Sequence, residues 1–179
     1  NKSDAYGLTR AENANIAAVA LSHKDFDSRE SYDQALITKI DQFSPDVIVL
    51  AGFMRILSPA FVQYYQGKLV NIHPSLLPKY QGLNTHQRAI DAGDKVHGVS
   101  VHFVTEELDG GPNAIQAIVP ILDIDNAPQL QQRVHTQEHV IYPIAVKWFC
   151  EGCLTMKGSE ALLDGKSLPT SGVQLDSRD

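Results

Sequence analysis

Cysteine, tryptophan and methionine are scarce: the 179 residues include two cysteines, one tryptophan and two methionines. Two cysteines cannot build the disulfide framework of a small secreted domain, so the fold depends on a hydrophobic core. Apolar runs are short as well, and none approaches the roughly 20 residues of a membrane-spanning helix. The opening residues, NKSDAYGLTRAENA, lack the apolar segment of a secretory signal peptide. We therefore expect a cytoplasmic protein without a membrane partner.

Positive charge is also in deficit, because 15 lysines and arginines face 21 aspartates and glutamates, which gives a net charge of −6. This balance argues against a nucleic-acid partner. Hydrophobic residues make up 43% and charged residues 20%, as in soluble globular proteins. The length fits one domain. We predict a single domain over residues 1–179, in which residues 153–179 form a C-terminal hairpin and a frayed tail.

Alternating patterns in the first third of the chain predict an α/β fold. A short helix is expected over residues 5–13 and a strand over the apolar residues 16–21. Asp27 or Ser28 can cap the next helix, whose apolar stripe would contain Tyr32, Leu36, Ile40 and Phe43. Residues 46–53 are nearly all apolar, which is typical of a strand covered on both faces.

The order strand, helix, strand implies parallel pairing with a right-handed crossover. We therefore predict a doubly wound, mostly parallel sheet with helices on both faces. The later elements expected are a short helix from Ser58, a strand at 69–73, a helix at 84–92, strands at 97–104 and 114–121, and a long helix at 127–151. The apolar stripe of that long helix would contain Leu130, Val134, Ile141, Ala145 and Trp148.

Residues 68–82, KLVNIHPSLLPKYQG, are the stretch around which the chain is organised. They begin as a strand and turn at Pro74, which favours an extended conformation for His73. Asn71 and His73 are two residues apart, so both side chains lie on one face at the end of the strand. An amide and an imidazole at that position can both donate hydrogen bonds to a developing oxyanion.

The loop at residues 106–112, EELDGGP, supplies a carboxylate. Two glycines follow Asp109, which allows a sharp turn and the close approach of a ligand. The preceding strand could lie beside the strand at 69–73, and Asp109 would then reach the imidazole of His73. By itself, an Asp–Gly pair is more often an exposed turn.

Four segments together resemble the folate-dependent formyltransferases: AGFMRILSP, NIHPSLLPKYQG, HGVSVHFVTEELDGGP and RVHTQEHVIYP. The resemblance covers nearly the whole chain. It is strongest to members that move the formyl group of 10-formyltetrahydrofolate to the amine of glycinamide ribonucleotide, in purine biosynthesis. It implies a Rossmann-like fold, a reduced folate co-substrate, no metal, small-molecule partners, and a monomer or homodimer.

The resemblance also implies roles for individual residues. Asn71 and His73 would donate to the oxyanion of a tetrahedral intermediate, and Asp109 would orient His73 and help to pass a proton. His102 points away from the Val101 and Phe103 face of its strand, so it is a possible second donor. Folate-binding residues would be Leu50, Phe53, Arg55, Ile56, Leu57, Val104, Thr105, Glu106 and Leu108.

Nucleotide-binding residues implied by the resemblance are Gly52, Met54, Pro74, His135 and Glu138. Glu138 flanks the apolar stripe of the long helix, and it forms either a surface salt bridge or, by resemblance, a contact to the ribose hydroxyls. His135 occupies a position that is usually glutamine in the family. Cys150 and Cys153 have the spacing of a redox or zinc motif, but no second pair completes a zinc site. We interpret both as structural thiols.

Family members begin with a strand and a glycine-rich loop whose backbone amides hold the substrate phosphate. No such loop occurs here, and we expect that the N-terminal βαβ portion, about 30 residues, is missing from this chain. Alternative interpretations are a methionyl-tRNA formyltransferase, a formyltetrahydrofolate hydrolase, or a folate-binding fragment without catalysis.

Overall fold

The computed structural model describes residues 1–177. These residues form two compact units, one containing Asn1–Pro45 with Leu57–Phe61 and the other containing Asp46–Ile56 with the chain from Val62 onward. The single domain expected over residues 1–179 stays a prediction.

The first unit contains α1 (Tyr6–Asn13), a short 3₁₀ helix (His23–Asp25) and α2 (Arg29–Asp41). Ser28 caps α2 as predicted: its Oγ accepts a hydrogen bond from Ser31 N at 3.0 Å, and Ser31 Oγ accepts one from Ser28 N. The predicted apolar stripe of α2 is correct only in part: Tyr32 is buried and Leu36 and Ile40 are half-buried, but Phe43 is 57% exposed. The other buried residues of the helix are Asp33 and Ile37. Asp33 faces inward because its Oδ2 accepts a 2.6 Å hydrogen bond from Ser58 N.

The strand predicted over residues 16–21 is not formed. The side chains of Ile16 and Val19 are 63% and 45% exposed. An apolar run becomes a strand only where a neighbouring strand takes up its backbone hydrogen bonds, and the described chain supplies no strand that pairs with this run.

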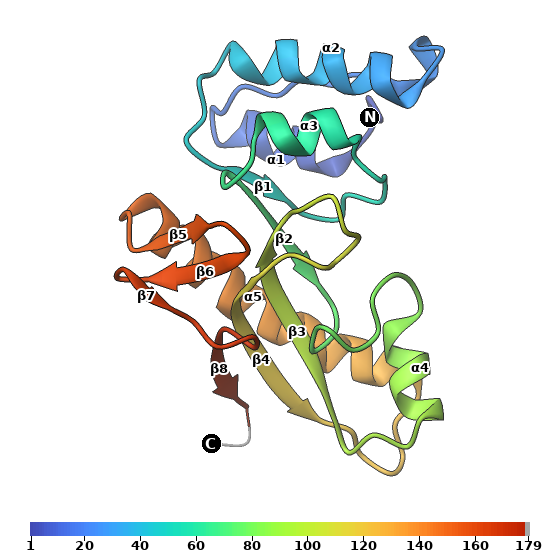
Figure 1. The fold of residues 1–179 in the computed structure, drawn as a ribbon. Helices are drawn as coiled ribbons and strands as arrows, with labels where there is room; N and C mark the ends of the chain where they lie inside the picture. Colours follow the sequence, from blue (N-terminus) through green and yellow to red (C-terminus); the bar gives the residue numbers. More distant parts are fainter. Residues whose placement is uncertain (178–179) are drawn as a thin grey trace. The chain divides into compact units, whose positions relative to one another are not determined.

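The second unit is built on a five-stranded sheet in the order β1-β2-β3-β4-β8 (Figure 1). Its strands are β1 (Ile48–Leu50), β2 (Leu69–His73), β3 (Val96–Phe103), β4 (Asn113–Pro120) and β8 (Val173–Asp176). β1 pairs with β2 in parallel, as the crossover through α3 (Pro59–Tyr64) predicts. β2 with β3 and β3 with β4 are antiparallel, and β4 with β8 is parallel, so the sheet is mixed.

The strand predicted over residues 46–53 is shorter and less buried than its composition suggests. It spans only Ile48–Leu50, lies at the edge of the sheet, and leaves Val49 41% exposed. The expectation that it is covered on both faces is therefore wrong. An apolar run does not by itself report the position of its strand in the sheet.

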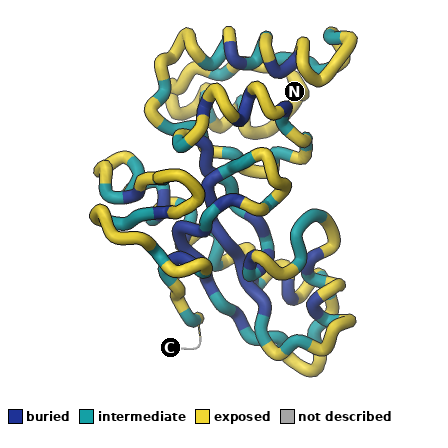
Figure 2. Tube along the Cα trace, viewed as in Figure 1, coloured by how far each residue is buried: buried dark blue, intermediate teal, exposed yellow. Residues whose placement is uncertain are grey.

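β3 and β4 form the centre of the core and are buried along most of their length (Figure 2). α5 (Ala127–Cys150) packs along these strands through the predicted stripe, and Leu130, Val134, Ile141 and Ala145 are all buried. α4 (Thr85–Asp91) packs against α5. Among the described residues, no helix is both long and apolar enough to cross a membrane.

The C-terminal region contains the expected hairpin within a small antiparallel sheet of β5 (Leu154–Lys157), β6 (Glu160–Leu163) and β7 (Lys166–Ser167). The frayed tail is a wrong prediction as far as residue 177, because β8 pairs with β4 from Ile115↔Val173 to Ile118↔Asp176. Its four residues are too short to be recognised without their partner strand. Residues 178 and 179 lie outside the described part of the chain.

Candidate active site

β2 carries Asn71 and His73 on one face, and it has the predicted bounds. β3 is antiparallel to β2, with Val70 opposite Phe103 and His73 opposite Ser100. The loop after β3 therefore leaves beside the start of β2 and folds back toward its end. The two strands lie side by side, as expected, although they are antiparallel in a sheet that was predicted to be mostly parallel, and the returning loop brings Asp109 to His73.

His73 lies between a carboxylate and a carbonyl group. Its Nδ1 is 3.4 Å from Asp109 Oδ2, and its Nε2 is 2.9 Å from the carbonyl oxygen of Tyr80. The side chains of His73 and Asp109 are 8% and 9% exposed. The Tyr80 oxygen can only accept, so Nε2 carries a proton. Asp109 Oδ2 faces the other ring nitrogen, so the carboxylate can orient the imidazole.

The segment after Pro78 holds both members of this pair in place, and no pattern in the sequence predicted this role. Tyr80 supplies its carbonyl oxygen to His73, and Gly82 N donates to Asp109 Oδ2 at 3.0 Å. Gln81 Nε2 donates to the Asp109 carbonyl oxygen at 3.3 Å. Residues 80–82 therefore position the imidazole and the carboxylate together.

A buried polar network holds this segment on the sheet. Ser100 Oγ donates to Ser75 O at 2.7 Å and accepts from Leu77 N at 3.1 Å. Gln116 Nε2 donates to Leu77 O and to Ser100 Oγ, each at 2.9 Å. Because Ser100 and Gln116 belong to β3 and β4, the core of the sheet sets the position of the segment that carries Tyr80.

Asn71 has His102 as its neighbour on β3. His102 Nδ1 is 2.8 Å from Phe103 O and therefore donates, which leaves Nε2 as an acceptor for Asn71 Nδ2 at 3.3 Å. Burial lowers the pKa of His102, against the opposing effects of the Phe103 carbonyl and Asp109. His102 is thus a neutral acceptor that orients the Asn71 amide, and one amide hydrogen of Asn71 remains for another acceptor.

The glycines of the Asp-Gly-Gly turn were expected to allow a sharp turn and the approach of a ligand, and the structure shows a further, steric reason for them. Asp109 itself adopts φ = 50°, in the left-handed region. A Cβ on Gly111 would lie 1.9 Å from Phe103 O, so glycine is required there by the neighbouring strand. The turn allows the chain to pass close to β3 while Asp109 points to His73.

Comparison with known proteins relates the chain to one protein family. The formyl transferase family matches residues 1–146. The chain belongs to this family. The phosphoribosylglycinamide formyltransferase of Escherichia coli is 57% identical over 176 residues, which cover 98% of this chain and 83% of that protein. The Haemophilus influenzae protein of the same name is 52% identical over 172 residues, covering 96% of this chain and 81% of that protein.

Solved structures agree with the expected Rossmann-like formyltransferase fold. The phosphoribosylglycinamide formyltransferase of Coxiella burnetii, in complex with CHES, has a TM-score of 0.93 and 49% identity, and the match covers 97% of this chain and 82% of that chain. The Symbiobacterium toebii glycinamide ribonucleotide transformylase 1 has a TM-score of 0.86 and 38% identity, covering 90% of this chain and 76% of that one. The alternative interpretations are not favoured by these relatives.

In this formyl transferase, most of the residues expected to bind folate lie on two irregular segments, one after β1 and one after β3. Ile56 on the first segment is 61% exposed, and Leu108 on the second is 53% exposed. Met54, expected to bind the nucleotide, lies on the first segment and is 77% exposed. Exposed apolar side chains of this size suit a ligand-binding surface. Glu106 Oε1 accepts a 2.7 Å hydrogen bond from Gln63 Nε2, and Leu57 belongs to the first unit.

The expected nucleotide-binding residues are separated along the second unit. Gly52 follows β1 with φ = 62°, and Pro74 follows β2, where its carbonyl accepts from Thr85 Oγ1 at 2.6 Å. His135 and Glu138 lie on α5 and contact each other, with His135 Nδ1 2.9 Å from Glu138 Oε2. Burial lowers the pKa of His86 on α4, and the charge of Glu138 partly opposes this by raising it.

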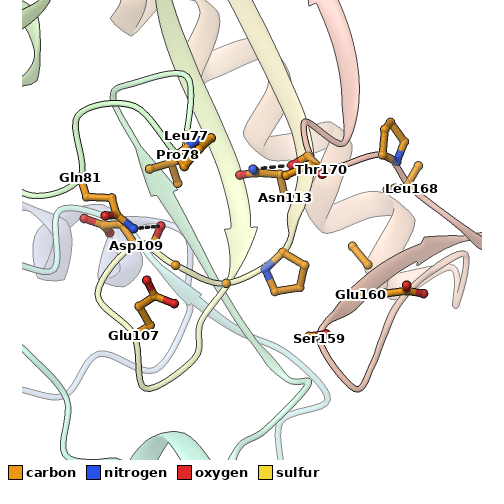
Figure 3. Close-up of a pocket in the computed structure, with 15 residues that line it drawn as sticks. Leu77, Pro78, Gln81, Glu107, Asp109, Asn113, Ser159, Glu160, Leu168 and Thr170 are labelled. Carbon is orange, nitrogen blue, oxygen red and sulfur yellow. Dashed lines mark hydrogen bonds between the residues drawn. The ribbon is translucent and has the colours of Figure 1, made fainter.

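A cavity of about 320 Å³ borders the Asp109 loop, lined by Leu77, Pro78, Glu107, Asn113, Thr170 and neighbouring residues (Figure 3). Asp109 is the one residue that it shares with the predicted site residues. In Figure 3 the Gln81 amide reaches the Asp109 backbone from across the loop. Cys150 and Cys153 are both free thiols.

Proposed function

We propose that this formyl transferase moves the formyl group of 10-formyltetrahydrofolate to the primary amine of glycinamide ribonucleotide. The observation that carries the proposal is the buried His73–Asp109 pair beside Asn71 in a chain 57% identical to the Escherichia coli phosphoribosylglycinamide formyltransferase. Such a constellation suits acyl transfer, which needs oxyanion donors and a proton carrier.

The reaction begins with attack of the nucleotide amine on the formyl carbon. A C–N bond forms, the carbonyl electrons move to oxygen, and a tetrahedral oxyanion results. The second amide hydrogen of Asn71 donates to this oxygen, while the bond to His102 Nε2 holds the amide in place. One such donor typically contributes about a hundredfold to a thousandfold in rate.

His73 is the second donor to the oxyanion. Both of its ring nitrogens have partners in the structure, so donation requires that one contact opens when the substrates bind. The carbonyl of Tyr80 is the partner that gives way, because a neutral acceptor holds an N–H more weakly than a carboxylate does. Asp109 stays on Nδ1 and keeps the ring oriented.

Collapse of the intermediate breaks the bond between the formyl carbon and N10 of the folate. The proton lost by the attacking amine ends on N10, and the His73–Asp109 pair carries it, directly or through water. No metal and no covalent enzyme intermediate takes part. The products are formylglycinamide ribonucleotide and tetrahydrofolate, and all atoms are accounted for.

Substrate binding follows from the placement of the remaining residues. Leu50 at the end of β1 and two irregular segments, one with Phe53, Arg55 and Ile56 and one with Val104, Thr105, Glu106 and Leu108, hold the folate between apolar side chains and backbone groups. Glu138 accepts hydrogen bonds from the ribose hydroxyls, near Gly52, Met54, Pro74 and His135.

The test is a direct assay of the purified chain with 10-formyltetrahydrofolate and glycinamide ribonucleotide, with mass spectrometry of the products. We expect formylglycinamide ribonucleotide in an amount equal to the tetrahydrofolate released. Parallel reactions contain methionyl-tRNA or no acceptor. Formylated methionyl-tRNA, or formate without an acceptor, would show that the substrate assignment is wrong.

A further inference from the structure

One exposed face of α5 carries two histidines and a glutamate at positions i, i+3 and i+4. They are His135, Glu138 and His139, and the two imidazole rings have centroids 4.5 Å apart at an interplanar angle of 74°. The His135 side chain is 61% exposed and that of Glu138 is 24% exposed. Residues four apart on a helix lie on one face, so the continuous helix fixes this grouping.

The hydrogen bonds define which nitrogen atoms can bind a ligand. Glu138 Oε2 lies 2.9 Å from His135 Nδ1, and a carboxylate oxygen accepts, so this nitrogen carries the proton. His135 Nε2 is then left with its lone pair and accepts a hydrogen bond from His139 Nε2 at 3.1 Å. A metal ion that binds both nitrogens replaces the proton between them, and that proton leaves to solvent while His139 keeps its other ring proton on Nδ1.

The separation of these two nitrogens matches the requirement of a shared metal ion. Imidazole nitrogens bind Zn²⁺ at about 2.0–2.1 Å, so two ligands at angles between square and tetrahedral lie about 2.9–3.4 Å apart. The carboxylate on His135 Nδ1 is the partner that metal-binding histidines usually have, since it fixes the tautomer and raises the basicity of the ligand nitrogen.

We propose that α5 carries a site for a divalent transition-metal ion, formed by His135 Nε2 and His139 Nε2 and supported by Glu138. Within residues 1–177, no group of three or more His, Cys, Asp or Glu side chains is arranged to hold a metal ion. The protein therefore supplies two ligands, and water or a bound molecule completes the coordination. Imidazole ligands favour Cu²⁺, Ni²⁺ and Zn²⁺ over Mg²⁺ and Ca²⁺, which prefer oxygen.

This site has a consequence for catalysis that rests on the proposed function. Glu138 is the proposed acceptor for the ribose hydroxyls, and metal binding holds its carboxylate on His135 Nδ1. The metal ion and the nucleotide then compete for Glu138. A metal ion on α5 should raise KM for the nucleotide while kcat at saturating nucleotide stays the same.

The experiment titrates Ni²⁺, and separately Zn²⁺, into the purified protein without substrates, using isothermal titration calorimetry. We expect one ion per chain, with affinity reduced at least tenfold in His135→Gln and in His139→Gln, and about tenfold in Glu138→Gln. His23→Gln removes a histidine from another helix and should bind as the unchanged protein does. Circular dichroism of each variant confirms that α5 is folded.

The possible outcomes distinguish failure of the metal site on α5 from failure of the proposed role of Glu138 in nucleotide binding. Unchanged affinity in His135→Gln and His139→Gln overturns the site, as does loss of binding in Cys150→Ser, which would assign the ion to the thiols. Binding with the expected variant pattern but without competition against glycinamide ribonucleotide leaves the metal site in place and removes Glu138 from the nucleotide site.

Discussion

His73 Nδ1 lies 3.4 Å from Asp109 Oδ2, and both side chains are more than nine-tenths buried. Two strands and two loops are needed for this contact, because β2 carries the imidazole and the loop after β3 returns along the sheet with the carboxylate. Residues 80–82 hold both groups through a carbonyl, an amide N–H and a side-chain amide. The pair is therefore oriented before any substrate binds, which is what proton transfer at a fixed position requires.

Asp109→Asn should lower kcat by about a hundredfold to ten-thousandfold, the range lost when a general acid or base is removed. Asparagine keeps the size and the bond from Gly82 N, so KM for the folate should change little. Steady-state kinetics with each substrate varied in turn measures both parameters. Equal losses in kcat and in folate binding would show that Asp109 is only architectural.

Asn71→Leu should lower kcat by about a hundredfold to a thousandfold, because the isosteric side chain cannot donate to the oxyanion. KM for both substrates should stay within a fewfold, since the donor acts mainly on the intermediate. His102→Leu is the companion variant: it removes the acceptor that orients Asn71 and should cost less than Asn71→Leu. A larger loss in His102→Leu would make His102, and not Asn71, the principal group.

The parts of this arrangement that the sequence predicts are those with local causes. The bounds of β2 follow from apolar residues and Pro74, the stripe of α5 follows from helical spacing, and the Asp-Gly-Gly turn announces a tight loop. The prediction of a strand at 16–21 was wrong because strand formation depends on a partner strand that no local pattern reveals. β8 formed without having been predicted for the same reason, since its partner β4 lies far away in the chain.

The contacts that hold His73 and Asp109 in place were also not predicted from the sequence. Tyr80 acts through its carbonyl oxygen and Gly82 through its amide, and neither group depends on the side chain that the sequence displays. Ser100 and Gln116 read as ordinary strand residues, yet they join β3 and β4 to the segment that carries Tyr80. Only the fold shows which polar residues become neighbours.

Gln116→Leu should destabilise the protein by about 1–3 kcal/mol, the cost of leaving buried polar groups unsatisfied. The substitution removes the donor to Leu77 O and to Ser100 Oγ, at a site where the Gln116 side chain is 2% exposed. It should also lower kcat, because the loosened segment carries the Tyr80 and Gly82 contacts. Urea unfolding and kinetics measure the two effects.

The matched control is Gln131→Leu, on the exposed face of α5, which should change the free energy of unfolding by less than about 0.5 kcal/mol. Full activity in Gln116→Leu despite the loss of stability would show that the network supports the fold without positioning residues 80–82.

Acid should destabilise the protein through His97, which is 1% exposed and packs its ring against His86 at 5.2 Å and Tyr80 at 6.0 Å. Burial, and then the neighbouring His86, lower the pKa of His97 from 6.5 to about 4, against the Pro74 carbonyl and Asp94, which raise it. The unfolded chain therefore takes up a proton at this residue in a pH range where the folded chain does not.

This difference in proton uptake determines the direction in which folding stability changes with pH. Above pH 6.5 His97 is neutral in both states and stability is unaffected, whereas stability falls as the pH drops from 6.5 to about 4. Between pH 7 and pH 5 this one residue should cost about 2 kcal/mol, at about 1.36 kcal/mol per unit of pKa difference. His97→Gln keeps a polar side chain without the titration, so its unfolding free energy should fall by about 2 kcal/mol less than that of the unchanged protein over the same interval. Urea unfolding at both pH values gives the comparison, and other titrating groups cancel in the difference. Identical pH dependence in the two proteins would mean that His97 takes up its proton equally in the folded and unfolded chains.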